Sequence, residues 1–412
     1  MLKLLTFSTL YPNDMQPNHG IFVENRLCHL VASGEVTSTV VAPVPWFPSP
    51  SPRFGDWAKY ASVAQHEIRH GIVVHHPRYP VVPRFGMSIA PYLLYWAALR
   101  SIQRLPVEVR CVDVIDAHYV YPDGVAAVWL GQRLGIPVVI TARGTDVSLI
   151  PQYALPRRLI RRAIDGAAAL IGVSAAIKAA LVDLGASPDK VTVLRNGVDT
   201  ALFRPVDRDM ARAALGLVRP TLISVGLLID RKGHHRVIEA MTQLPEMDLI
   251  IVGEGPERSR LSALIERLGL TNRVRLLGAR PHAELPMLYG AADALVLASS
   301  REGWANVLLE SMACGTPVVA SNIWGNPEVV QAPEAGVIAQ ENTPDGIASA
   351  VRSLFAHRPA PAMTRAYAER FSWDETTAGQ IALFRSVVRQ MSNITAPVTN
   401  EDYHGPIWRN RR

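Results

Sequence analysis

The sequence predicts an α/β protein made of two Rossmann-like domains, each with a doubly wound parallel sheet. Two observations carry this prediction. The chain has 412 residues, about twice a common domain length, and short apolar runs alternate with helical patterns along nearly all of it. Continuous apolar strands separated by helices form parallel sheets that are covered on both faces. We therefore expect two such sheets that face each other across a cleft.

The expected strands fall into two sets, one in each half of the chain. The first set is 2–8, 36–42, 72–75, 112–118, 138–141, 170–173 and 191–194. The second set is 221–225, 248–252, 274–277, 294–298, 318–321 and 336–338. A stretch rich in turn formers, 196–205, separates the two sets. We assign residues 1–200 to a first domain and 201–374 to a second domain.

One more helical pattern follows the second set of strands. Residues 375–391 carry an apolar stripe at Ile381, Leu383, Phe384, Val387 and Val388. We expect this helix to pack back on the first domain. The polar residues after it, 392–412, predict a loosely ordered tail.

Composition narrows the class of protein. Half of the residues are apolar, and three widely separated cysteines form no CxxC pair, so neither a disulfide framework nor a zinc site is expected. The first apolar stretch breaks at 11–14 without a signal-peptide cleavage site, and no apolar run is long enough to span a bilayer. These features favour a cytoplasmic protein.

The net charge is +6, and the first 200 residues carry most of it. A basic first domain favours an anionic partner, such as a membrane surface or a pyrophosphate-bearing acceptor. No nucleic-acid partner is expected, because no helix-turn-helix, zinc-finger or RNA-recognition pattern is present. Two features of the first domain favour peripheral attachment to the inner face of a membrane. One is a basic helical face, for which a solvated charged face is the alternative: Arg157, Arg158, Arg161 and Arg162. The other is an aromatic run, for which a core helix is the alternative: Tyr92, Tyr95 and Trp96.

The segment 294–321 reads as strand, loop, helix, stop and strand. Asn306 is the expected N-cap of this helix. The backbone amides from Gly303 to Val307 can receive a diphosphate at the positive helix end. Glu310 on the helix can hold two ribose hydroxyls, and Glu302 in the loop can contact a sugar ring. The alternative is that both acids are solvated groups of an ordinary αβ unit.

Two other loops of the second sheet lead to the same edge. Gly226 follows the strand 221–225, and Lys232, with Arg231 beside it, lies at a helix start where its ammonium can meet a phosphate. Gly253 follows the strand 248–252 and lets another group approach closely. Each signal alone is weak, but all of them lie at one edge of one sheet.

Glu302 and Glu310, within EGWANVLLESMACGTPVVAS, together with GEGP at 253–256 and NGVD at 196–199, resemble the retaining glycosyltransferases of family 4. The N-terminal TLYPNDMQPNHGIFVENR is similar to the members that serve teichuronic-acid biosynthesis. The resemblance implies the GT-B fold, with an acceptor-side domain at 1–200 and a nucleotide-sugar-binding domain at 201–374. It also implies ribose binding by Glu310, a donor-hexose contact by Glu302 and neutralisation of the diphosphate by Lys232. One departure is Leu227, where the family commonly has Arg; Arg231 is the candidate that compensates.

Candidates on the first-domain side follow the strands of the first sheet. The resemblance implies that His118 touches the donor sugar near the reacting carbon, so His118 and Glu302 are the predicted catalytic residues. The alternative for His118 is a hydrogen-bonded core histidine. Gly20 allows the backbone to approach the phosphates or acceptor, unless its loop is only a mobile surface loop. Arg143, where family members often have His, is assigned to an acceptor or a phosphate contact, and Asp146 to the acceptor side.

The sequence therefore predicts a retaining glycosyltransferase that moves a hexose-type sugar from a UDP- or GDP-linked donor to a glycan or lipid-linked acceptor in bacterial envelope or exopolysaccharide synthesis. No metal and no cofactor are expected. One alternative is a nucleotide-sugar 2-epimerase, which turns over the donor without an acceptor. Another is a non-catalytic nucleotide-sugar-binding scaffold.

Overall fold

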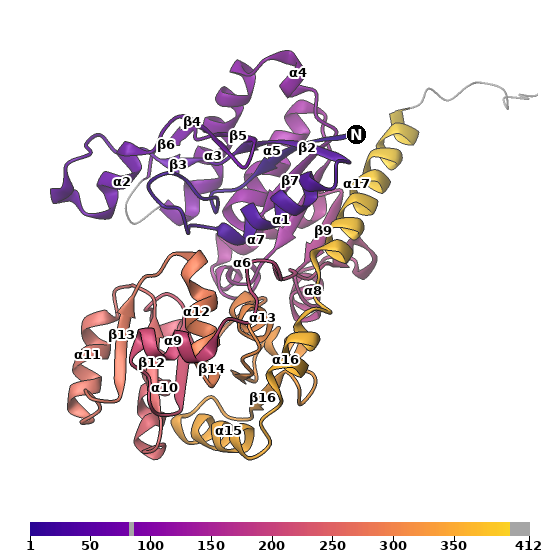
Figure 1. Ribbon diagram of the computed structural model, residues 1–412. Helices are drawn as coiled ribbons and strands as arrows, with labels where there is room; N and C mark the ends of the chain where they lie inside the picture. The colour runs from indigo at the N-terminus through magenta and orange to yellow at the C-terminus, as the bar shows by residue number, and fades with distance from the viewer. Residues whose placement is uncertain (82–85, 396–412) are drawn as a thin grey trace, which may run out of the picture.

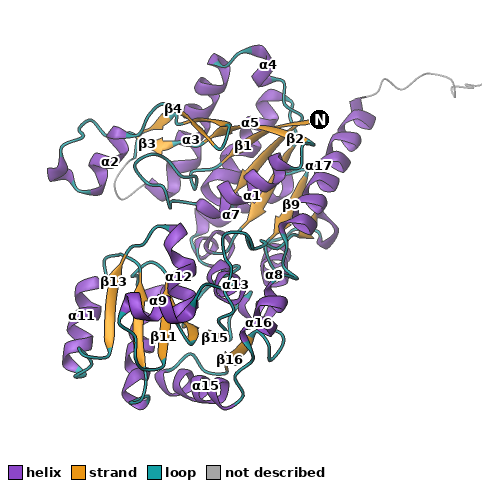
Figure 2. Ribbon diagram, in the orientation of Figure 1, coloured by secondary structure: helices purple, strands orange, loops and turns teal. Residues whose placement is uncertain are grey.

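A computed structural model describes residues 1–81 and 86–395 and contains two lobes, each with a sheet flanked by helices (Figure 1). The predicted fold class is confirmed. One sheet lies in residues 2–193 and the other in residues 221–339. Figure 2 shows both sheets with helices packed around them. The domain limits at 200 and 374 stay a prediction.

The first sheet has eight strands in the order β10-β9-β8-β7-β1-β2-β5-β4. All neighbours run parallel except the edge strand β4, which pairs antiparallel with β5. The sequence did not predict β4, because it has no buried residue and so no apolar run. The strands are β1 (Leu2–Phe7), β2 (Val36–Val41), β4 (His66–Arg69), β5 (Ile72–His75), β7 (Val114–His118), β8 (Val138–Ala142), β9 (Ala169–Gly172) and β10 (Val191–Val193), and a separate pair is formed by β3 (Val44–Pro45) and β6 (Arg78–Tyr79).

The second sheet has six strands, all parallel, in the order β13-β12-β11-β14-β15-β16. Its central strands are almost wholly buried, as expected for a sheet covered on both faces. The strands are β11 (Thr221–Val225), β12 (Asp248–Val252), β13 (Val274–Gly278), β14 (Ala294–Leu297), β15 (Val318–Ser321) and β16 (Gly336–Ala339).

Helices connect the strands of both sheets. Those of the first lobe are α1 (Ile21–Ala32), α2 (Asp56–Ser62), α3 (Gly86–Arg104), α4 (Val107–Arg110), α5 (Val125–Leu134), α6 (Thr145–Ser148), α7 (Ala154–Gly166) and α8 (Ala175–Asp183). Those that follow are α9 (Arg208–Leu215), α10 (His234–Ala240), α11 (Arg258–Arg267), α12 (Leu285–Ala291), α13 (Asn306–Ala313), α14 (Asn326–Val329), α15 (Pro344–Ala356), α16 (Pro361–Ala368) and α17 (Trp373–Thr395). Among the described residues, no helix is both long and apolar enough to cross a membrane.

The last helix returns to the first lobe, as the sequence predicts (Figure 1). Ile381, Phe384 and Val387 of α17 are buried in one cluster with apolar residues of β1 and α1. The helix begins earlier than expected, at Trp373, whose ring stacks on His29 of α1 at 5.1 Å. The expected tail is partly wrong, because residues 392–395 belong to α17; residues 396–412 lie outside the described residues.

Glu328 of the second lobe forms hydrogen bonds and an ion pair with residues 175–195. The carboxylate of Glu328 accepts hydrogen bonds from the backbone N–H groups of Ala175 and Ala176 at the start of α8, at 2.9 and 3.0 Å. The same carboxylate pairs with Arg195 at 2.8 Å. A carboxylate at a helix N-terminus is favoured by the helix dipole. These bonds hold the lobes close to each other beside the cleft.

Candidate active site

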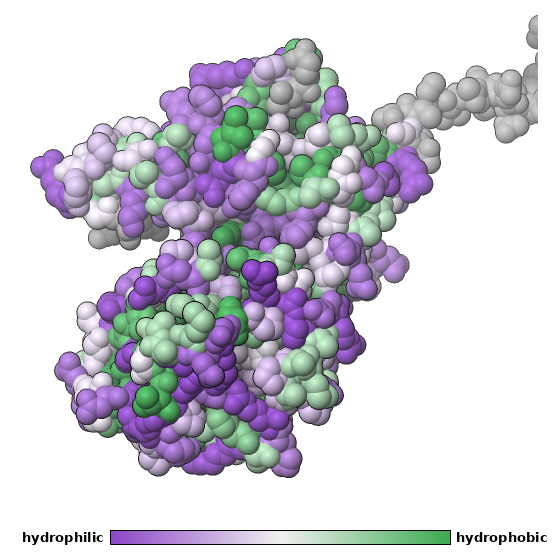
Figure 3. Space-filling view, viewed as in Figure 1, coloured by the Kyte–Doolittle hydropathy of each residue, from purple (hydrophilic) through white to green (hydrophobic). Residues whose placement is uncertain are grey.

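A pocket of about 760 Å³ lies between the two lobes and is lined by residues of both. The space-filling view shows the surface hollowed between them (Figure 3). This volume is in the range of pockets that hold small-molecule ligands. Nine of the predicted site residues line it: Gly20, Arg143, Gly226, Arg231, Lys232, Glu302, Gly303, Asn306 and Val307. Four others, His118, Asp146, Gly253 and Glu310, do not.

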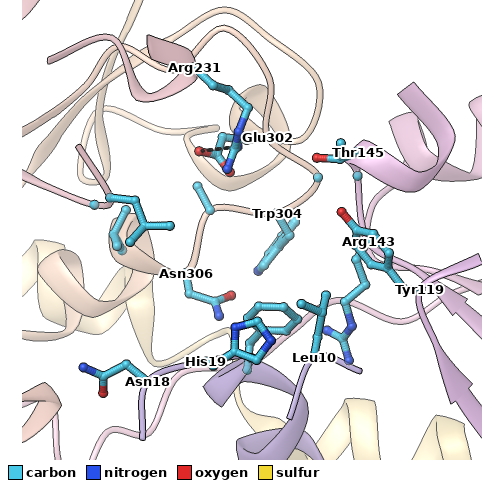
Figure 4. A pocket seen from close by; sticks show the side chains of 18 of the residues that line it. Leu10, Asn18, His19, Tyr119, Arg143, Thr145, Arg231, Glu302, Trp304 and Asn306 are labelled. Carbon is cyan, nitrogen blue, oxygen red and sulfur yellow. Dashed lines mark ion pairs between the residues drawn. The ribbon is translucent and has the colours of Figure 1, made fainter. Parts of the chain in front are cut away.

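Glu302 is the centre of a charged cluster on the second-lobe side (Figure 4). Its Oε1 lies 2.6 Å from Nζ of Lys232 and 3.6 Å from Nη1 of Arg231. The hydroxyl of Ser299 donates to the same oxygen at 2.8 Å. Burial raises the pKa of Glu302, but the charges of Lys232 and Arg231 outweigh burial and hold it below its usual range. Glu302 is therefore ionised at neutral pH and paired with Lys232.

The glycine loops bring backbone close to these charges. A Cβ on Gly226, whose φ is +154°, would lie 3.3 Å from the Lys232 side chain. A Cβ on Gly253 would lie 1.9 Å from the carbonyl oxygen of Gly226. Gly253 thus supports the Gly226 loop from behind and does not reach the pocket. The next residue, Leu227, is 60% exposed and lines the pocket, so this position supplies no charge.

The start of α13 differs from the sequence prediction. The predicted N-cap, Asn306, is wrong by one position, because Ala305 is the N-cap residue and makes no side-chain cap. The Oδ1 of Asn306 instead accepts a hydrogen bond from Nδ2 of Asn196 at 3.1 Å. The start of this helix therefore has no side-chain cap, and residues 303–307 line the pocket. A helix start of this kind favours an anionic ligand.

Glu310 lies one turn into α13, just outside the pocket lining. Its Oε2 accepts from the hydroxyl of Tyr289 at 3.0 Å, and its Oε1 lies 3.4 Å from Nε2 of His282. Burial lowers the pKa of His282, but the hydrogen bond and the charge of Glu310 outweigh it and raise the pKa overall. The sequence analysis did not assign Tyr289 and His282, which hold the carboxylate in place. The ribose contact of Glu310 stays a prediction.

His118 does not face the pocket, contrary to the sequence expectation. Side chains alternate along a strand, so Asp116 and His118 of β7 lie on the same face of the sheet. Arg26 of α1 and Gln380 of α17 cover this face; the Gln380 amide donates to Oδ2 of Asp116 at 3.2 Å. His118 is 1% exposed, and its contacts fit the alternative of a hydrogen-bonded core histidine.

Arg143, by contrast, lines the pocket on the first-lobe side (Figure 4). Its Nη2 donates to Nδ1 of His118 at 2.8 Å, and its Nη1 donates to Oδ1 of Asn196 at 3.4 Å. The guanidinium carbon lies 4.9 Å from the ring centre of Phe22. Burial and then the charge of Arg26 lower the pKa of Arg143 to about 9. The side chain is therefore a cation in an unfavourable environment.

Asp146 is not available to an acceptor, which corrects its assignment. The residue is fully buried, and its carboxylate accepts the backbone N–H groups of Gly144 at 2.7 Å and of Val120 at 2.8 Å. It also accepts from the N–H of Arg143. Asp146 shapes the loop that carries Arg143. The buried Asp123, which the sequence analysis did not assign, has a similar role, because it accepts from the backbone and the hydroxyl of Thr9.

The two lobes touch at Gly303, where a Cβ would lie 1.8 Å from the carbonyl oxygen of Arg143. Asn196 joins the same region, because its side chain contacts both Arg143 and Asn306. The indole of Trp304 donates to the carbonyl oxygen of Asn196 at 3.1 Å. The sequence analysis recognised residues 196–199 as a motif and a boundary. It did not place Asn196 in the site, because the contacts of Asn196 come from residues distant in sequence.

Two family models match the chain and together cover most of it. "Glycosyltransferase Family 4" matches residues 26–202, and "Glycosyl transferases group 1" matches residues 207–371. A D-inositol 3-phosphate glycosyltransferase of Segniliparus rotundus is 32% identical over 305 residues, which are 67% of each chain. The teichuronic acid biosynthesis glycosyltransferase TuaC of Bacillus subtilis is 28% identical over 333 residues, which are 79% of this chain and 82% of TuaC.

Solved structures share the fold across nearly the whole chain. Sucrose-phosphate synthase from Thermosynechococcus elongatus superposes with a TM-score of 0.75 at 21% identity, over 95% of this chain and all of the other. HepE of Anabaena, solved with UDP, superposes with a TM-score of 0.69 at 22% identity, over 94% of this chain and all of HepE. These matches confirm the two-lobed GT-B architecture that the sequence predicts.

Proposed function

This chain belongs to glycosyltransferase family 4, and we propose that it moves a hexose-type sugar from a UDP- or GDP-linked donor to a glycan or lipid-linked acceptor, with retention of configuration. The observation that carries the proposal is the Lys232–Glu302 pair, at 2.6 Å, beside the uncapped start of α13 in the pocket between the lobes. This arrangement supplies a cation and backbone donors for a diphosphate and a carboxylate for a sugar ring. The UDP bound to HepE of Anabaena supports a nucleotide-sugar donor.

The proposed transfer needs no covalent intermediate with the protein. The acceptor hydroxyl attacks the anomeric carbon from the face on which the diphosphate leaves, and a new carbon–oxygen bond forms. The bond between the anomeric carbon and the phosphate oxygen breaks, its electron pair goes to the diphosphate, and the hydroxyl proton passes to the departing phosphate oxygen. Lys232 and the backbone amides at the start of α13 stabilise the growing charge. We propose that no resident metal takes part. The Asp-x-Asp triplet at 207–209 lies at the start of α9, where Asp207 caps the helix, and it does not line the pocket.

Bacterial envelope or exopolysaccharide synthesis is the proposed setting, and similarity to TuaC supports it. We also propose peripheral attachment at the inner face of the cytoplasmic membrane. All four arginines of α7 (157, 158, 161 and 162) are exposed, and Tyr92 and Trp96 of α3 are 48% and 53% exposed. Sedimentation with vesicles that contain anionic lipid tests this attachment. The absence of binding at low ionic strength would contradict it.

A donor screen tests the function itself. Purified protein is mixed with UDP-, GDP-, ADP- and dTDP-sugars, and the melting temperature and the release of nucleotide are followed. We expect one donor to stabilise the protein, Glu310→Ala to remove this effect, and nucleotide release to depend on an acceptor. Release of an epimerised sugar without an acceptor would favour the 2-epimerase. Binding with neither product would favour a non-catalytic scaffold.

A further inference from the structure

The guanidinium of Arg143 is buried without a carboxylate partner. Among the described residues, its hydrogen bonds go only to uncharged acceptors, Nδ1 of His118 and Oδ1 of Asn196. Its Nε has no partner. Arg143 is 9% exposed, and it lines the pocket. Because a buried charge is normally paired, this cation is poised to accept an anion from the pocket.

The contacts of His118 fix its protonation. A guanidinium can only donate, so Nδ1 of His118 must be the acceptor of the 2.8 Å bond from Arg143. Its Nε2 then carries the hydrogen and donates to Oδ2 of Asp116 at 3.2 Å. The imidazole is therefore neutral. Burial lowers the pKa of His118, and Arg143 and Arg26 add to this effect while Asp116 opposes it.

Asp116 is itself held from two helices. Gln380 of α17 donates to its Oδ2 at 3.2 Å and accepts from Nε of Arg26 at 2.9 Å. Arg26 also donates to the side chain of Asn196 at 3.3 Å. All of these groups are buried. The orientation of Arg143 is therefore fixed by the core of the first lobe, whereas the second-lobe cations Arg231 and Lys232 lie in a short 3₁₀ helix between β11 and α10.

The cations of the second lobe neutralise only part of the charge of a diphosphate. Lys232 and Arg231 both lie close to Glu302, so part of their charge is already balanced, and Leu227 adds none. Arg143 lies close to the start of α13, because Asn196 connects its guanidinium to Asn306 through bonds of 3.4 and 3.1 Å. This helix start is where the diphosphate is expected.

We propose that Arg143 is the first-lobe residue that binds an oxygen of the donor's diphosphate, and that His118 and Asp116 are positioning residues that hold its guanidinium toward the pocket. The inference rests on the proposed function, because it requires a nucleoside diphosphate in the pocket. It gives His118 a positioning role in place of a direct contact with the sugar.

The test measures binding of UDP and of uridine by calorimetry, because only UDP carries the diphosphate. We expect Arg143→Met to reduce the preference for UDP over uridine about tenfold, the scale of one hydrogen bond to a charged group, and Arg143→Lys to reduce it less. His118→Leu should lose most of the same preference with little change in uridine binding. His118→Gln should keep it, because its amide oxygen accepts from Arg143 and its NH₂ group donates to Asp116. Arg133→Met, at an exposed position of α5, is the matched control.

Several results would overturn the inference. An unchanged preference for UDP over uridine in Arg143→Met would show that Arg143 does not contact the diphosphate. Equal weakening of both ligands in His118→Leu, or a loss in His118→Gln as large as in His118→Leu, would reduce His118 to a structural residue. If His118→Leu does not fold, the preference for UDP over uridine is compared between His118→Gln and Arg143→Lys. A loss in His118→Gln as large as in Arg143→Lys would then contradict the inference. If the parent protein binds neither UDP nor GDP, the proposed function fails and the inference fails with it.

Discussion

The two sides of the pocket hold their charges in opposite ways. On the second-lobe side, Lys232 and Arg231 lie in a short 3₁₀ helix (Asp230–Lys232), share Glu302 and are 14% and 26% exposed. On the first-lobe side, Arg143, His118 and Asp116 are each at most 9% exposed and are fixed by buried hydrogen bonds. One side pairs its cations with a carboxylate, and the other keeps a cation without one.

This difference suggests a division of roles. The Lys232 ammonium carries three donors, so it can bind a phosphate while it still contacts Glu302. A buried arginine cannot move, but it needs no reorganisation when charge develops beside it. The second-lobe side is therefore the adaptable one, and the first-lobe side is preorganised.

The largest expected effect comes from removing the lysine of the adaptable side. Lys232→Ala should reduce the rate of nucleotide release from the donor about 10²- to 10³-fold, the usual loss when one charge-stabilising donor is removed. Initial rates at saturating donor measure it. Lys232→Arg keeps the charge and should retain more activity. A rate for Lys232→Ala close to that of the parent protein would show that the adaptable side does not stabilise the leaving group.

A smaller effect should follow from separating the two sides. A Cβ at position 303 would lie 1.8 Å from the carbonyl oxygen of Arg143, so Gly303→Ala must push the lobes apart at this contact. We expect donor affinity to fall about tenfold, because both sides must contact one ligand. Titration of the donor measures this change. Gly86→Ala is the control, since its Cβ would meet only ordinary contact, at 3.9 Å. Unchanged affinity in Gly303→Ala would mean that the contact has no part in binding.

A modest gain should follow from adding charge to the adaptable side. Leu227→Arg places a cation at an exposed position of the pocket lining and should tighten UDP binding by a few fold, as expected for a charge contact near solvent. The gain should shrink at high salt. Leu227→Met is the uncharged control. If Leu227→Arg binds UDP no better than Leu227→Met, Arg231 already compensates for the missing charge.

The smallest expected effect concerns stability. It tests how much ionisation of the buried Asp123 destabilises the first lobe. Burial raises the pKa of Asp123 to about 7, although its bonds to Thr9 oppose the shift. A carboxyl whose folded-state pKa is raised stabilises the fold at pH below its unfolded pKa, and this stability is lost as pH rises through the folded pKa. The melting temperature should therefore fall between about pH 4 and 7, and Asp123→Asn should flatten that slope. Parallel slopes for the two proteins would contradict the assignment.

The charged residues on the second-lobe side of the pocket could be predicted from the sequence. Parallel strands end at one edge of a sheet, so the residues after 221–225 and 294–298 had to meet there. This rule correctly brought Lys232, Glu302 and Gly226 together. It did not apply to His118, because a residue inside a strand points to one of two faces, and only the packing of α1 and α17 decides which face is covered.

The sequence by itself determined the two sheets, the returning helix and the loops that carry charge, because apolar periodicity and turn residues are local properties. Tertiary structure alone decided which polar groups became partners. Asn196 contacts Asn306 across the two lobes. Gln380 contacts Asp116, which lies 264 positions earlier in the sequence. Such bonds depend on which distant backbone segments become neighbours in space, and a local sequence pattern does not contain that information.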